Sequence, residues 1–177
     1  MVFARTKLMI HDYCMEIKPK KLVLNYSGPN PQIAVKNYIE VLKKAFKVSD
    51  TEIQEKNFDW DRSGKEEKFT INFELRKDLD KNTYLWIQGD IKGVIRPGGE
   101  FGEEGNVTIR VDGAVRAEYP QDTFWQRSLF YEMFRVFYHK VLYISLWEKY
   151  MAECRDMMRL FIDEMKSYFG LLRRGMM

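Results

Sequence analysis

Five polar or aromatic side chains recur at every fourth position within an otherwise apolar stretch near the C-terminus. They are Arg127, Tyr131, Arg135, His139 and Tyr143. Residues four apart lie on one face of a helix, so this spacing places two guanidinium groups, an imidazole and two phenols in one row. If the row faces the interior, it is suited to orienting a small apolar or anionic ligand. If it faces water, it is only a solvated stripe, and the spacing leaves both alternatives open.

Histidine is the usual proton carrier near neutral pH, and the sequence contains only His11 and His139. Neither accompanies a Gly-x-Ser-x-Gly motif or another nucleophile context, so a hydrolase triad cannot be argued. His139 is a candidate general base, with Glu132 or Tyr131 in support, because helix-lined cavities often shift such pKa values. Whether the protein is an enzyme stays open at this point.

Two turn-rich segments resemble ion-binding loops but lack the required chemistry. The run from Gly98 to Gly105 carries three glutamates and no Lys-Ser or Lys-Thr pair after it, which is unsuited to phosphate. The run from Asp59 to Gly64 matches the first half of an EF-hand loop, yet Thr70 occupies the position of the bidentate glutamate. We expect hairpin turns at both places, with no metal site and no cofactor.

The two cysteines, Cys14 and Cys154, lie far apart, and neither has a neighbouring Cys or His at metal-binding spacing. We therefore expect free thiols, as in a reducing compartment. The first residues also lack the apolar run of a secretory signal. Both features predict a cytoplasmic protein.

The most apolar stretch, residues 129–147, contains Glu132, Arg135, His139 and Lys140. Each charge near the centre of a bilayer costs about 2.5 to 3.5 kcal/mol. We therefore expect this stretch to be a core helix, and we expect no membrane partner. The net charge of +3 is mild, and its basic clusters at residues 18–21 and 43–44 form no continuous stripe. This distribution disfavours nucleic-acid binding.

Three runs of strict alternation predict an antiparallel sheet with one apolar face. Their apolar positions are Phe69, Ile71, Phe73 and Leu75; Leu85, Ile87, Ile91 and Ile95; and Val107, Ile109, Val111, Val115 and Ala117. A preceding strand, residues 52–60, changes phase between Ile53 and Phe58, which indicates a bulge or an edge position. Before it, two extended stretches within residues 8–26 lead to an amphipathic helix that should begin at Asn30 and Pro31.

Residues 121–169 contain neither Gly nor Pro and have a helical period. One straight helix of that length would measure roughly 70 Å, so we expect a break, near residues 144–147. The following pattern steps by four and three, as in a helix–helix seam. Its predicted interface residues are Trp147, Met151, Met158, Phe161, Met165 and Tyr168. Such a seam could pack inside the domain or join two copies as a homodimer.

The order of elements predicts a single α+β domain over residues 1–177, built as two layers. Residues 1–48 supply strands and the first helix, residues 49–119 an antiparallel meander of at least four strands, and residues 120–177 a long C-terminal helix pair. In outline this order resembles the helix-grip folds of lipid-transfer and polyketide-cyclase-like proteins. That resemblance implies a cavity between the sheet and the terminal helix.

Two functions follow from these observations. The first is small-ligand binding in a pocket between the sheet and the helix over residues 124–147, with Arg127, Arg135 and His139 orienting the polar end of the ligand. The alternative is a protein-interaction or homodimerisation module that uses the seam over residues 147–172. No sequence motif identifies the ligand or the partner.

Overall fold

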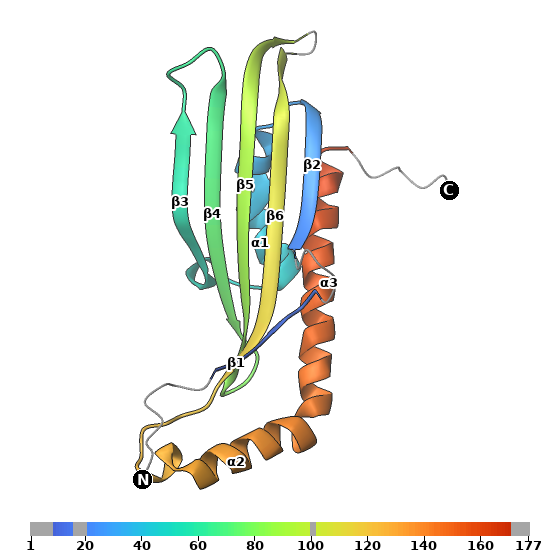
Figure 1. Cartoon of the computed structure of the whole chain (residues 1–177). Coiled ribbons are helices and arrows are strands. Elements are labelled where there is room, and N and C mark those ends of the chain that lie inside the picture. Colours follow the sequence, from blue (N-terminus) through green and yellow to red (C-terminus); the bar gives the residue numbers. More distant parts are fainter. Residues whose placement is uncertain (1–8, 16–20, 100–101, 171–177) are drawn as a thin grey trace, which may run out of the picture.

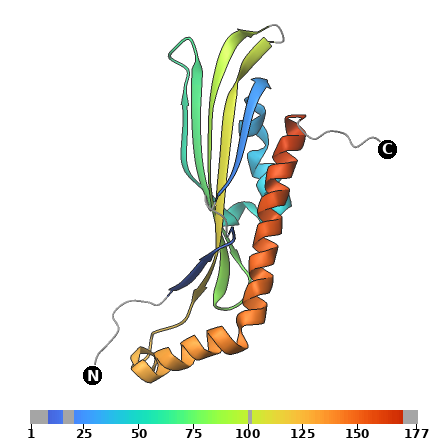
Figure 2. The ribbon, with the colours of Figure 1, turned by 45° about the vertical axis from the view of Figure 1, so that its right-hand side comes forward.

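The computed structural model describes residues 9–15, 21–99 and 102–170. Within them, a six-stranded antiparallel sheet carries helices α1 (Ile33–Phe46) and α3 (Ile144–Tyr168) on one face (Figures 1 and 2). The predicted α+β class, with its covered antiparallel sheet, is confirmed.

The sheet is a meander to which the two N-terminal strands are added. Its strands are β1 (Met9–Tyr13), β2 (Lys21–Pro29), β3 (Ile53–Asp61), β4 (Glu67–Asp78), β5 (Thr83–Gly99) and β6 (Gly102–Glu118). The spatial order is β1-β6-β5-β4-β3, and β2 also pairs with β6. Because β1 pairs with residues 114–118 and β2 with residues 104–112, these two strands lie one after the other along β6. Strand β3 is at the sheet edge with a register shift between Glu55 and Asn57, so the predicted bulge and edge position are confirmed.

The alternating runs place their apolar side chains in one core against α1 and α3. Phe73 is fully buried, and its ring lies 6.2 Å from the ring of Phe161 on α3. Gly89 is the cross-strand partner of Phe73. A Cβ atom at Gly89 would lie 2.2 Å from the Phe73 ring, so the missing side chain makes room for that ring over β5.

Helix α1 begins two residues later than predicted from the sequence, with Gln32 in place of Asn30 as the N-cap and Ile33 in place of Pro31 as the first helical residue. Asn30 has a left-handed backbone (φ 55°), and its N–H donates to the Glu103 carbonyl at 2.9 Å. That bond holds Asn30 next to β6, outside the helix. Gln32 is the residue that precedes the first helical turn, and Lys47, also left-handed, ends the helix.

The expectation of free thiols is wrong, because Cys14 and Cys154 form a disulfide with their Cα atoms 5.9 Å apart. The Cys14 N–H donates to the Gly113 carbonyl of β6, so the residue directly after β1 lies on the sheet. Both cysteines are fully buried, where α3 crosses the sheet. A sequence separation of 140 residues gives no local sign of this pairing.

The C-terminal region breaks at Tyr143, immediately before the expected 144–147 window. The elements before α3 are η2 (Trp125–Arg127), α2 (Leu129–Phe137) and the single π-helical turn η3 (Tyr138–Leu142). Helix α3 runs along the sheet, whereas α2 lies beyond the sheet's end at an angle to α3 (Figures 1 and 2). The first helix of the predicted pair therefore does not cover the sheet.

Candidate functional site

The candidate site lies at the end of the sheet, where α2 and η3 meet the end of β6 and the β4–β5 turn (Figure 1). Ser128 begins α2 with an extended backbone, and its hydroxyl accepts the Tyr131 N–H at 3.3 Å. This cap satisfies one of the free N–H groups of the first turn and so defines where α2 begins.

The row of five residues faces the domain along most of its length. Arg135 and His139 are buried, Tyr131 and Tyr143 are half-buried, and Arg127 is exposed. The Arg127 guanidinium instead donates to the Gln121 carbonyl at 3.0 Å. The structure thus brings four of the five predicted residues against the domain and leaves Arg127 at its surface.

Arg135 is the most unusual member of the row, since its guanidinium is only 2% exposed. One amino group donates to the carboxylate of Glu132, which also accepts from Gln121 at 2.9 Å. Among the described residues, Arg135 Nε and Nη1 have no acceptor. The rings of Tyr119 and Tyr131 lie 5.6 and 6.0 Å from the guanidinium carbon, so the charge lies within a cation–π environment.

His139 lies in an aromatic enclosure on the π-helical turn. Its Nδ1 is 3.0 Å from the Tyr119 hydroxyl, and its ring contacts Trp147 edge-on at 4.6 Å. Burial lowers the pKa of His139, opposed by the nearby Asp12 carboxylate. Burial also raises the pKa of Tyr119 to about 12. The imidazole is therefore neutral and the phenol protonated at neutral pH.

Tyr143 fastens the start of α3 to the β4–β5 turn. Its hydroxyl donates to the Asp80 carboxylate and lies 2.8 Å from Thr83 Oγ1. Burial alone would raise the pKa of Asp80, but hydrogen bonds from Tyr143, Asn82 and Thr83 hold it below its ordinary value. Neither Asp80 nor Tyr119 was among the site residues predicted from the sequence. Neither residue belongs to the helical row, and only the three-dimensional fold brings them to it.

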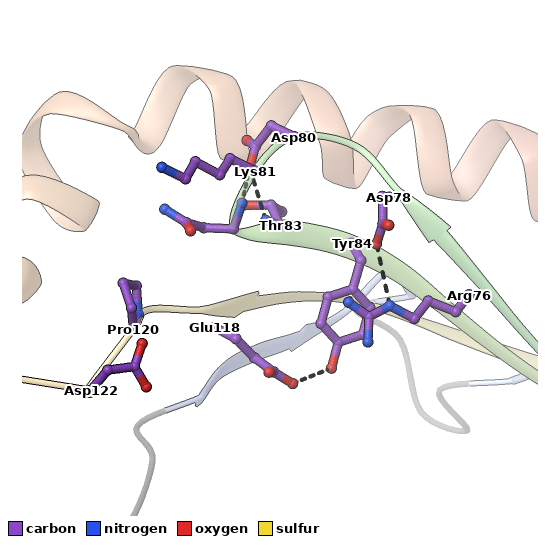
Figure 3. Close-up of a pocket in the computed structure, with 10 residues that line it drawn as sticks. Arg76, Asp78, Asp80, Lys81, Thr83, Tyr84, Glu118, Pro120 and Asp122 are labelled. Carbon is purple, nitrogen blue, oxygen red and sulfur yellow. Dashed lines mark hydrogen bonds and ion pairs between the residues drawn. The ribbon is translucent and has the colours of Figure 1, made fainter.

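A cavity of about 300 Å³ lies beside this junction, on the outer side of the β4–β5 turn. Figure 3 shows Arg76, Asp78, Tyr84 and Glu118 around it. The Tyr84 hydroxyl donates to Glu118 at 2.7 Å, and Arg76 lies over the Tyr84 ring while donating to Asp78 at 3.2 Å. These four side chains therefore have partners within the chain.

The pocket expected between the sheet and residues 124–147 differs from the observed arrangement. Helices α1 and α3 contact the apolar face of the sheet, and α2 lies beyond its end. The expectation of a core helix over residues 129–147 is also wrong for α2 and η3. Because the polar row faces inward, the apolar side chains face out, and the most exposed of them are Leu129, Phe130, Met133, Phe134, Phe137 and Leu142. We call these six residues the apolar face of α2–η3.

The predicted seam on α3 packs within its own chain. Trp147, Met158, Phe161 and Met165 are buried in the core, Met151 is half-buried and Tyr168 is exposed. Trp147 Nε1 donates to Asp12 at 3.0 Å, and the ring of Phe161 lies 6.1 Å from that of Phe46 on α1. A second copy could reach the buried members only by displacing the sheet or α1. The heptad spacing therefore corresponds to an intramolecular contact.

Within residues 9–15, 21–99 and 102–170, no group of His, Cys, Asp or Glu side chains could hold a metal ion. In the same ranges, no helix combines the length and the apolar character that crossing a bilayer requires.

Comparison with known proteins identifies no family. No family model matches the sequence, and no curated protein matches it. A solved structure of a protein of unknown function from Staphylococcus aureus aligns with 83% of this chain and 96% of its own, at 12% identity and a TM-score of 0.23. At that level of similarity the match adds nothing about function.

Proposed function

We propose that the protein is a docking module that binds its target through the apolar face of α2–η3. The observation that carries this proposal is the exposure of large side chains there: Phe130 is 75% exposed and Leu129 is 71% exposed. Taking roughly 150 to 250 Å² for each full side chain, the six side chains together expose on the order of 600 to 1,000 Å² of apolar surface. The largest apolar patch on a typical monomer is about 300 to 600 Å².

The attachment of α2 to the domain supports this function. An amphipathic helix normally buries its apolar side and exposes its polar side. Here the polar side is turned inward, where the Arg135 guanidinium lies over the Tyr119 ring and His139 hydrogen-bonds the Tyr119 hydroxyl. Further on, the Tyr143 hydroxyl fixes the end of η3 to Asp80. These contacts present the apolar face in a fixed orientation, as a docking surface requires.

The test uses the double substitution Phe130→Ser with Phe134→Ser in the full chain, and binding of a fluorescent apolar probe such as anilinonaphthalene sulfonate. We expect saturable probe binding that weakens at least tenfold in the double variant. The thermal midpoint should stay unchanged, because exposed side chains contribute little to folding. Phe58→Ser is the matched control, since Phe58 is an exposed phenylalanine on β3, far from α2. A large drop in the thermal midpoint of the double variant would place the face in the folded core and defeat the proposal.

A second candidate function, binding of a small anionic ligand by the inward row, is supported by one observation. Arg135 Nε and Nη1 are buried guanidinium donors without an acceptor among the described residues. Tyr131, His139 and Tyr143 are the members of the row that would orient such a ligand, and Arg127 is its exposed first member. Benzoate is a suitable probe: it should raise the thermal midpoint of the wild type, and Arg135→Met should weaken that effect at least tenfold. If benzoate leaves the thermal midpoint of the wild type unchanged, this second function is ruled out.

The cellular compartment is also a proposal. The sequence favoured the cytoplasm, but the Cys14–Cys154 disulfide supports a compartment in which disulfides persist. Alkylation of free thiols during rapid lysis, followed by mass measurement, distinguishes the two. An unmodified pair would indicate the oxidising compartment, and two alkylated cysteines the reducing one.

A further inference from the structure

We propose that the target of the apolar face of α2–η3 is a lipid bilayer, in which α2 lies parallel to the membrane plane at the boundary between headgroups and acyl chains. This inference rests on the proposed docking function and names its partner. A helix of this kind needs one apolar face, not the length to cross the membrane. It is therefore compatible with the nine residues of α2.

The angular width of the face favours a bilayer over a second copy of the chain. At about 100° per residue, the exposed apolar side chains of α2 span roughly 160° of the helix circumference. The positions that define this arc are Val136, Leu129, Met133, Phe137, Phe130 and Phe134, all of them exposed. A contact between two helices uses the narrower stripe of a and d positions. A bilayer contacts the whole width of the apolar face of an interfacial helix.

The exposed charges of this region also suit a lipid surface. Between residue 123 and the start of α3 at Ile144, the exposed charged side chains are Arg127 and Lys140, and both are basic. The acidic Glu132 is half-buried and bound by Arg135. The long stem of Lys140 allows its ammonium group to reach the headgroups while the adjacent side chains are immersed. Anionic headgroups would complement both cations.

The aromatic side chains occupy the positions expected at such a boundary. Trp125 is 65% exposed in η2, directly before α2, and Tyr138 is exposed directly after it. Indole and phenol rings with one polar atom concentrate at membrane interfaces. In the sequence they bracket the part of the apolar face that lies on α2, which therefore has an indole on one side and a phenol on the other.

The position of α2 in the fold allows a plane to reach it. Helix α2 projects beyond the end of the sheet, at an angle to α3 (Figures 1 and 2). Its inner side contacts Tyr119 through Arg135, and its apolar side chains on the other side are exposed, so the apolar face points away from the domain. A bilayer can then contact α2 along its length while the sheet stays in water.

The experiment is co-flotation of the full chain with vesicles of phosphatidylcholine, with and without phosphatidylglycerol. We expect binding to both, several-fold tighter with phosphatidylglycerol. Phe130→Ser with Phe134→Ser should lower the partition coefficient at least tenfold, and the Phe58→Ser control should leave it unchanged. Lys140→Gln should reduce only the preference for phosphatidylglycerol.

A second measurement, of fluorescence quenching, uses the wild type and a single substitution, so it does not depend on the folding of the double variant. Lipids brominated on the acyl chain should quench the fluorescence of vesicle-bound wild type. Trp125→Phe should abolish most of that quenching, since Trp147 is buried and the other two of the four tryptophans, Trp60 and Trp86, lie on the sheet. Equal quenching in wild type and Trp125→Phe would overturn the proposed orientation.

The remaining outcomes separate this inference from the docking function itself. Failure to float, combined with apolar-probe binding that requires Phe130 and Phe134, overturns the bilayer and leaves the docking function standing. Alternatively, the wild type fails to float and has the mass of a dimer by light scattering, while the double variant is monomeric. That result overturns the bilayer proposal and identifies a second copy of the chain as the target. If the wild type neither floats with the vesicles nor binds the probe, both proposals are overturned.

Discussion

Cys14, directly after β1, is joined by a disulfide to Cys154, which lies at the end of the third turn of α3 with its side chain against Gly113 of β6. The bond links the N-terminal strand to the C-terminal helix across 140 residues of sequence. Most of the fold lies inside the loop that it closes. In the unfolded chain, such a cross-link removes conformational entropy that grows with loop length.

Loss of this disulfide is expected to lower the free energy of unfolding by about 2 to 4 kcal/mol. Replacing both cysteines by alanine and measuring urea unfolding gives the value directly. Dithiothreitol should destabilise the wild type by a similar amount and leave the double variant unaffected, which is the control for effects of the alanines themselves. Identical unfolding curves for the reduced and oxidised wild type would contradict the pairing.

Phe161 is expected to be indispensable for folding, because it is fully buried between the rings of Phe46 and Phe73. Phe161→Ala should cost about 3 to 5 kcal/mol, and Phe161→Glu should prevent folding, as judged by circular dichroism. Tyr168→Ala is the matched control from the same predicted seam, since Tyr168 is exposed and should cost little. A folded, monomeric Phe161→Glu variant would instead place this residue at an interface between copies.

Local periodicity was sufficient to predict the sheet and α1, because an alternating pattern or a 3.6-residue repeat indicates directly which side chains are buried. The start of α1 was misplaced because a hydrogen bond from Asn30 to β6, distant in sequence, overrides the local capping preference. The same limit explains the missed disulfide between Cys14 and Cys154.

For the candidate site, periodicity identified an amphipathic helix but did not show which of its sides faces the domain. The apolar side of residues 129–142 was taken for a core surface, as it is in most amphipathic helices. The polar side faces inward because it finds partners in other parts of the chain. Tyr119 binds His139, and Asp80 binds Tyr143. Contacts of this kind leave no repeating pattern in the sequence.

The two members of the Arg135–Glu132 pair should respond very differently to substitution. Glu132→Gln leaves a buried guanidinium without its counter-charge, and we expect it to cost about 3 kcal/mol or more in urea unfolding. Arg135→Met removes the charge and keeps the aliphatic stem, so its cost should stay below about 1 kcal/mol. Arg127→Met, at an exposed arginine of the same row, serves as the control. An Arg135→Met variant that is the less stable of the two would show that the guanidinium makes stabilising contacts beyond Glu132.

His139 should make the stability of the protein depend on pH in the range where imidazoles titrate. Burial lowers its pKa in the folded state below the ordinary value of 6.5, so the unfolded chain binds a proton more readily than the folded one. The contribution of the neutral imidazole is therefore complete above pH 6.5 and is lost as the pH falls through the folded-state pKa. Between those two pKa values, the free energy of unfolding should fall by at most about 1.4 kcal/mol per pH unit.

Urea unfolding of wild type and His139→Gln over that pH range measures this contribution as a difference, which cancels the titration of the carboxylates. The wild type should lose stability toward acid more steeply than His139→Gln. The NMR titration of the His139 ring gives an independent measure, and a folded-state pKa at or above 6.5 would contradict the enclosure by Tyr119 and Trp147.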